Sequence, residues 1–175
     1  FSLDRYRADI VMIPAGPFPD WVDHLTLFDS PFVVIARRGH PAIAAAGIAP
    51  GAVLPLDLFC DIDHALFSPE GRVQSQSDAA LAELGRARRV VMTLPVFSGI
   101  CRVVAESDLI SVVPRQLGEI IGPKLGLDTY QLPMKMPVPR IVAAWHRRSA
   151  ANPTHRWLRE QLCEILRPLD TPSSG

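Results

Sequence analysis

The segment Arg89–Leu117 constrains the fold most, because two strand-like runs and a helix-like run follow one another there at short intervals. Val90–Leu94 is rich in β-branched residues and ends at Pro95, since proline cannot donate a hydrogen bond to a sheet. Phe97–Val104 has apolar residues at helical spacing, and Leu109–Val113 is a second apolar run that a proline also ends. This order predicts a compact right-handed strand–helix–strand crossover in a parallel sheet.

The carboxyl ends of these strands indicate where a ligand would bind. Open α/β sheets bind ligands outside the carboxyl ends of their strands, and Pro95, Val96 and Phe97 directly follow such an end. Free N–H groups at a helix start can bind an anion such as a carboxylate. The Phe97 ring can either border an aromatic ligand or pack in the core. The G-x-S-x-G pattern of a catalytic serine is absent, so the segment predicts a ligand cleft without a catalytic motif.

Other segments alternate between strand-like and helix-like patterns, which predicts the α/β class. The predicted strands are Ile10–Ile13, expected to be buried, Phe32–Ala36, His64–Phe67 and Ile141–Trp145. The predicted helices are Gln76–Leu84, stopped by Gly85, and a last helix that starts at Asn152-Pro153 and runs to about Leu166. Ser68–Gly71 fits a type I turn. Ile13 and Pro14 end a strand, so they are expected to face a ligand cleft as well.

Composition narrows the classes of protein. The chain has 175 residues and is 48% hydrophobic, which suits one domain or two small lobes with a real core. The 18 basic residues equal the 18 acidic ones, so the basic surface of a nucleic-acid binder is absent. Three scattered cysteines without metal-ligand spacing and no apolar run of membrane-spanning length predict a reduced, cytoplasmic protein without metal or other cofactor.

Four sets of residues resemble one bacterial family in the same order along the chain. The first set lies in and beside the crossover segment and comprises Arg88-Arg89, Leu94-Pro95-Val96-Phe97, Ser107-Asp108-Leu109-Ile110 and Pro114-Arg115. The others are Ala8–Pro14, the stretch from Leu27-Phe28-Asp29 to His40-Pro41, and Trp145-His146 with Asn152-Pro153 and Arg156–Arg159. Together they resemble the inducer-binding domain of LysR-type transcriptional regulators, in the branch of the nodulation and salicylate-responsive regulators.

The resemblance implies a two-lobed fold of the type II periplasmic-binding-protein kind. Lobe I would hold residues 1–50 and 132–170, lobe II residues 51–131, and residues 171–175 would be a polar tail. The family's inducer domains have a strand, a helix and a strand before the point that matches Phe1, so lobe I is expected to be truncated at its N-terminus. The family's helix-turn-helix DNA-binding domain would likewise lie outside this chain.

The resemblance also places the strand from His64 at the cleft between the lobes. His64 and Ser68 could then hydrogen-bond a carboxylate or phenol, although a single histidine can equally be a satisfied core or surface residue. Cys60 and His64 have no other Cys or His near them in the sequence, and a zinc site needs three or four ligands, so no zinc site is expected. The predicted ligand-binding set is Ile13, Pro14, His64, Ser68, Pro95, Val96 and Phe97.

The predicted function is therefore ligand sensing rather than catalysis. A small aromatic or acidic inducer would bind between the lobes, the domain would form a dimer or tetramer, and DNA would be bound only through the helix-turn-helix domain outside this chain. The alternative is a solute-binding protein or an enzyme built on the same two-lobed fold, because fold alone does not decide function.

Overall fold

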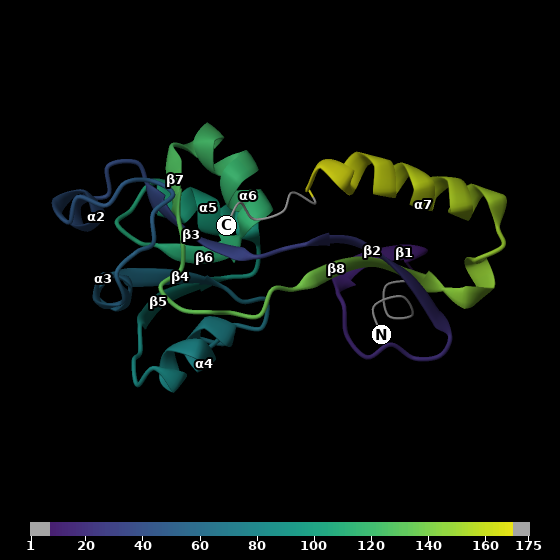
Figure 1. Ribbon diagram of the computed structural model, residues 1–175, viewed down its shortest axis with the longest axis horizontal. Helices are drawn as coiled ribbons and strands as arrows, with labels where there is room; N and C mark the ends of the chain where they lie inside the picture. The colour runs from purple at the N-terminus through teal and green to yellow at the C-terminus, as the bar shows by residue number, and fades with distance from the viewer. Residues whose placement is uncertain (1–7, 170–175) are drawn as a thin grey trace. The chain divides into compact units, whose positions relative to one another are not determined.

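The computed structural model describes residues 8–169, which form two compact units (Figure 1). Unit 1 contains residues 8–30 and 138–169, and unit 2 contains Pro31–Pro137. Two stretches of chain connect the units, as the resemblance implied, but at other positions. β3 (Phe32–Arg37) pairs with β6 (Ser111–Pro114) and with β7 (Leu127–Tyr130), so these strands all belong to unit 2. The expected boundaries at residues 50 and 132 therefore differ from the observed division.

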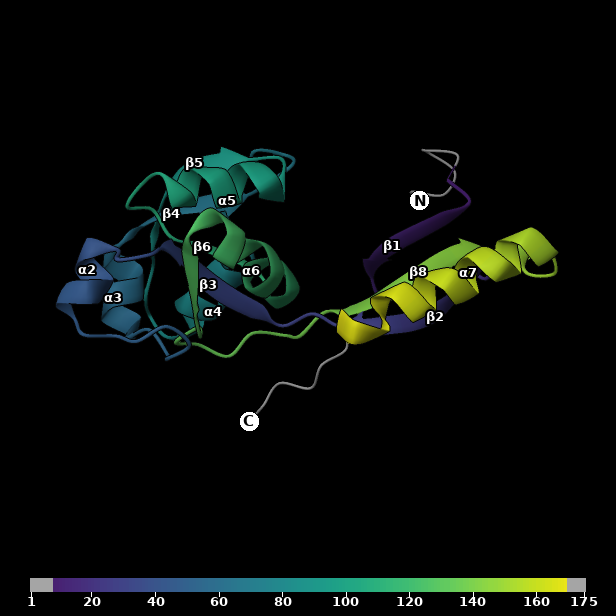
Figure 2. The same cartoon turned by 90° about the horizontal axis from the view of Figure 1, so that it is seen from above.

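Unit 1 is an antiparallel sheet with one long helix packed against it. The strand order is β1 (Ile10–Pro14), β8 (Arg140–His146) and β2 (Val22–Asp29). Helix α7 (Pro153–Leu166) lies along β8 and β2 (Figure 2), and Asn152 caps its start by accepting a hydrogen bond from the His155 N–H at 3.2 Å. Short 3₁₀ turns at Arg147–Ser149 and Arg167–Leu169 flank this helix.

Unit 2 has a mixed sheet with helices on both faces. The antiparallel strands β6, β3 and β7 continue into the parallel pair β4 (Asp63–Phe67) and β5 (Arg89–Leu94). The connection is made where the Ala65 N–H donates to the Ile110 carbonyl at 2.9 Å and the Ile110 N–H to the Asp63 carbonyl at 3.0 Å. The helices are α2 (Pro41–Ala45), α3 (Leu56–Asp61), α4 (Gln76–Glu83), α5 (Phe97–Ala105) and α6 (Arg115–Ile121), which runs into a 3₁₀ turn at Gly122–Leu125.

Two hydrophobic cores separate these layers. On one face of β3, Val34 and Ala36 pack in a cluster with Phe59 of α3 and Leu81 of α4. On the other face, a second cluster joins Val33 and Ile35 to Ile100 and Val104 of α5. A continuous apolar run such as β3 is therefore explained by burial on both faces.

The predicted crossover is present as β5, α5 and β6. Its strands are parallel, with β4 between them, and Gly85 ends α4 in the left-handed conformation at φ 66°. The sheet as a whole is mixed rather than parallel, because β3 enters it antiparallel to β6.

Some expectations were wrong. Strand Ile10–Ile13 was expected to be buried, but Met12 is 50% exposed, since β1 pairs only with β8 among the described residues. The elements β2, α2, α6 and β7 were not predicted. The predicted tail 171–175 lies outside the described residues. Within residues 8–169, no helix has the length and apolar character needed to cross a bilayer.

Replacing Gly118 with alanine is expected to destabilise unit 2 by about 1–3 kcal/mol, the usual cost of overpacking. A Cβ at Gly118 would lie 2.8 Å from Val33 Cγ2 and 3.1 Å from Thr129 Cγ2, where α6 rests on the sheet. Gly122→Ala is the control, since its Cβ would lie at an ordinary 3.6 Å from Leu127 Cβ. Urea unfolding measures both, and equal midpoints would contradict the close approach of α6 to the sheet.

Candidate ligand-binding edge

Four of the predicted residues lie together at the carboxyl ends of β4 and β5, and we call this set (Ser68, Pro95, Val96 and Phe97) the β4–β5 edge. The Ser68 N–H donates to the Leu94 carbonyl at 2.9 Å, which ties the two strand ends to each other. Val96 is the N-cap of α5 and is 53% exposed, and its side chain makes no capping hydrogen bond. The edge therefore combines an exposed apolar side chain with a helix start whose first N–H groups lack a side-chain partner.

Phe97 serves the core and borders the edge at once. Its ring stacks on that of Phe67 with centroids 3.9 Å apart and planes 13° from parallel, and it packs against the cluster of Ile100 and Val104. The residue stays partly exposed. The two interpretations of Phe97 from the sequence are therefore compatible, since one ring face is covered by Phe67.

His64 lies in the interior of unit 2. It is 0% exposed, and its ring meets that of Phe59 edge-on with centroids 4.6 Å apart. Its Nδ1 lies 3.2 Å from Nη1 of Arg88, which can only donate, so Nε2 carries the proton and donates to the Phe59 carbonyl at 2.8 Å. In this conformation His64 presents no atom to a ligand, so its predicted role as a ligand contact gains no support.

Burial and charge keep His64 neutral. Desolvation is the largest cause, and the nearby Arg88 cation is the second; together they lower the pKa of His64 from 6.5 to about 4. The hydrogen bond to Phe59 and the carboxylates of Asp78 and Asp63 act in the opposite direction but are outweighed.

Arg88 connects His64 to helix α4 and was not among the predicted site residues. Its side chain is 0% exposed, and its Nε and Nη2 each donate to one Asp78 carboxylate oxygen at 2.9 Å. Nη2 also donates to Ser75 Oγ at 3.0 Å. Ser75 and Asp78 form a capping box at the start of α4, which the spacing Ser75-x-x-Asp78 could have indicated from the sequence.

Asp78 is ionised within this network. Burial raises the pKa of Asp78, but the hydrogen bonds and charge of Arg88, together with those from Ser75, outweigh burial and hold the pKa below its ordinary value. The pair is therefore a true ion pair rather than a neutral contact.

The remaining predicted residues belong to unit 1. Ile13 and Pro14 end β1 opposite Val142 and Ile141 of β8, and Pro14 is exposed. Their participation in a common site with the β4–β5 edge stays a prediction.

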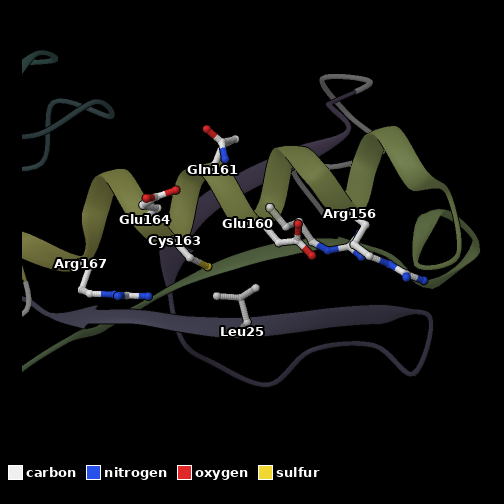
Figure 3. A pocket seen from close by; sticks show the side chains of 8 residues that line it. Leu25, Arg156, Glu160, Gln161, Cys163, Glu164 and Arg167 are labelled. Atoms are coloured by element: carbon white, nitrogen blue, oxygen red, sulfur yellow. The ribbon is translucent and has the colours of Figure 1, made fainter.

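Two hollows lie away from the β4–β5 edge. One, of about 530 Å³, runs between α7 and β2 in unit 1 (Figure 3). Its lining mixes arginines with glutamates: Leu25, Arg156, Arg159, Glu160, Gln161, Cys163, Glu164 and Arg167. The other, of about 350 Å³, lies in unit 2 beside Arg88 and is bordered by Val73, Gln74 and Val90. Within the described part of the chain, no three His, Cys, Asp or Glu side chains are grouped to hold a metal ion.

Curated relatives are transcription regulators. HTH-type transcriptional regulator SyrM 1 of Sinorhizobium fredii is 26% identical over 165 residues, which are 91% of this chain and 46% of that protein. HTH-type transcriptional activator NagR of Ralstonia is 26% identical over 140 residues, 80% of this chain and 44% of that protein. The chain thus spans about half the length of the curated relatives it matches, and both of these relatives are named as regulators of transcription.

Solved structures share the fold. The regulatory domain of MexT, a transcriptional activator of Pseudomonas aeruginosa, matches 94% of this chain and 76% of its own with a TM-score of 0.75 at 24% identity. The effector-binding domain of QuiR in complex with shikimate matches 95% of this chain and 76% of its own, with a TM-score of 0.67 at 14% identity. The expected two-lobed, periplasmic-binding-protein-like α/β fold is thereby confirmed.

The sequence pattern of one family covers nearly the whole chain. This family is the LysR substrate binding domain, and its pattern matches residues 2–167. The resemblance inferred from the four sets of residues along the chain is confirmed by this match and by the regulators among the relatives. The chain belongs to the family of LysR substrate-binding domains.

Proposed function

We propose that this domain senses a small organic molecule for a LysR-type transcription regulator and that the ligand binds at the β4–β5 edge. The observation that carries the proposal is the conjunction of the exposed Val96, the Ser68 hydroxyl and the uncapped start of α5 at the ends of two parallel strands. Ligand sites of this kind combine an apolar wall with a few polar groups that fix orientation.

An aromatic or other ring-shaped carboxylic acid suits these groups best. The free N–H groups of α5 favour an anion at the helix start, while Val96 and the edge of Phe97 favour an apolar ring. The bound shikimate in the QuiR domain supports this class, because shikimate is itself a ring with a carboxylate.

Val96→Asp is expected to weaken binding of a carboxylate ligand about tenfold or more, because it places a negative charge beside the helix start that should hold the anion. Titrations with benzoate and shikimate, followed by amide NMR shifts of Ser68 and Val96 in the unmodified protein and by calorimetry for the variant, measure the effect. Ile120→Asp on α6 is the matched control, since Ile120 is 48% exposed against 53% for Val96. Equal losses in both variants, or shifts elsewhere only, would place the ligand outside this edge.

We further propose that the regulator acts in the cytoplasm and binds DNA through a helix-turn-helix domain outside this chain. The curated relatives are named as HTH-type regulators, and the chain covers under half of the length of each of the two compared above. The isolated chain is neutral, so we expect it to leave promoter DNA unbound in a gel-shift experiment.

We also propose that the domain associates with itself. Trp157, Leu158 and Ile165 of α7 are 59%, 39% and 69% exposed, and β1 is paired on one side among the described residues. Apolar surface of this kind favours association. Sedimentation at roughly tens of micromolar should therefore show a dimer or larger species, and a 19.2 kDa monomer alone would count against it.

A further inference from the structure

The loop between β4 and α4 leads from the β4–β5 edge to the buried Arg88. It begins at Ser68, whose N–H is bonded to Leu94, and ends at Ser75, whose hydroxyl accepts from Arg88 Nη2. Residues 69–74 between these points are all exposed. The contacts inside the loop are local ones, namely the Gly71 N–H to the Ser68 carbonyl at 3.2 Å and the Arg72–Glu70 ion pair at 2.8 Å.

Arg88 is the residue that binds the far end of this loop to the rest of unit 2. Its guanidinium donates two parallel hydrogen bonds to Asp78, one to Ser75 and one to His64 of β4. One side chain therefore connects the start of α4, the end of the loop and strand β4. A planar fork fixes its partners in orientation as well as in distance, which a lysine ammonium cannot do.

The hollow of about 350 Å³ beside Arg88 gives the loop end room to move. Val73 and Gln74 border this space from the loop, and Arg88 and Val90 border it from the strand side. Val73 is 59% exposed, so packing holds the loop weakly and its course depends on the anchors at its two ends.

We propose that Arg88 is a positioning residue for ligand binding: by fixing Ser75 and Asp78, it sets the course of the 68–75 loop beside the β4–β5 edge. This inference rests on the proposed ligand site for its functional meaning. Arg88 itself has no exposed side-chain surface and acts through Ser75 and the loop.

Arg88→Lys tests the proposal, because lysine keeps the charge beside Asp78 but cannot reach Ser75 and His64 together. Trypsin cleavage after Arg72, in the middle of the exposed loop, reports how freely the loop opens. We expect cleavage at this bond to be about tenfold faster in Arg88→Lys than in the unmodified protein, while amide exchange in β4, β5 and α5 stays as slow as before. Ser75→Ala, which removes the hydroxyl that Arg88 holds, should show the same local effect.

Arg86→Met is the matched control. Arg86 lies two positions away and lines the same hollow, but its guanidinium donates to Asp57 and not to Ser75. Its cleavage rate at Arg72 should stay within about twofold of the unmodified protein. Faster amide hydrogen exchange throughout unit 2 in Arg88→Lys would mean that Arg88 only stabilises the fold, and it would overturn the proposal.

A titration with benzoate separates this inference from the proposed function. We expect benzoate to bind about tenfold more weakly to Arg88→Lys than to the unmodified protein, in keeping with the looser loop. Unchanged cleavage overturns the role of Arg88 whatever benzoate does, and faster cleavage with equal benzoate affinities overturns its connection to the site. Faster cleavage with benzoate bound by neither protein supports the anchoring of the loop and contradicts the ligand class proposed above.

Discussion

Replacing Arg88 with methionine is expected to lower the free energy of unfolding by about 3 kcal/mol, the lower end of the range for breaking a buried ion pair. Methionine fills much of the same space but leaves the ionised Asp78 without its two charged hydrogen bonds and His64 Nδ1 without a donor. The lower end applies because the Asp78 side chain keeps 21% of its surface exposed.

Urea unfolding of four proteins measures this loss and assigns it to the pair: the unmodified chain, Arg88→Met, Asp78→Leu and the double variant. If the cost arises from an unpaired buried charge, the double variant should be more stable than the sum of the single losses predicts. Arg86→Met is the control; the guanidinium of Arg86 pairs with Asp57 at the exposed surface, so this variant should lose much less stability than Arg88→Met. A strictly additive double variant would mean that Arg88 and Asp78 contribute independently.

Local sequence patterns predicted the elements whose cause is local. Asn152-Pro153 combines a side-chain cap with a proline that suits the first helical turn, and α7 starts there. Gly85 adopts φ 66° after α4, which glycine does at the least cost. The run before Pro95 and the helical spacing after it likewise identify β5 and α5. In each case the determining residues lie within a few positions of one another.

The sequence did not predict elements that form through contacts with residues far away in the chain, or whose ends lack a local signal. β7 is only the four residues Leu127–Tyr130, and it is a strand because it pairs with β3 about ninety positions earlier in the chain. Helix α6 follows Pro114 directly and has no capping side chain. From the sequence, Pro114 therefore indicated only the end of a strand and not the start of a helix. The burial of β1 was overestimated because a short apolar run does not reveal whether its second edge is paired.

The candidate site likewise includes residues that local sequence identified and residues whose environment depends on distant positions. Pro95, Val96 and Phe97 were identified from one strand end, and Ser68 joins them because β4 and β5 are parallel neighbours. The burial of His64 depends on Phe59 and on Arg88, which is 24 positions away, and no local pattern indicates that combination. Arg88 appeared in the sequence only as half of a basic pair, although its neighbour Arg89 is exposed and Arg88 is not.

The unfolding free energy is expected to fall by about 2–3 kcal/mol between pH 7.5 and pH 4.5 because of His64 alone. In the unfolded chain His64 takes up a proton near its ordinary pKa of 6.5, whereas in the folded chain its pKa is about 4. Between these values the unfolded state binds one more proton than the folded state. The contribution of His64 to the unfolding free energy is therefore fully present above about pH 6.5. It falls by about 1.4 kcal/mol per pH unit below that pH, and this fall ends near pH 4.

His64→Gln removes this pH dependence while keeping the polar contacts, since a glutamine amide can donate to the Phe59 carbonyl and accept from Arg88. The variant should lose the same amount of stability at every pH, because the packing of the ring is lost. The test is therefore how the difference in unfolding free energy between the two proteins, measured by urea unfolding, changes with pH. Asp78 does not disturb this window, because its lowered pKa means that its contribution is lost only below its ordinary value of 3.8. A difference that stays flat from pH 7.5 to pH 4.5 would contradict the prediction, because it would mean that the folded chain protonates His64 as readily as the unfolded chain does. The full burial of His64 and the Arg88 cation 3.2 Å from Nδ1 both oppose that protonation.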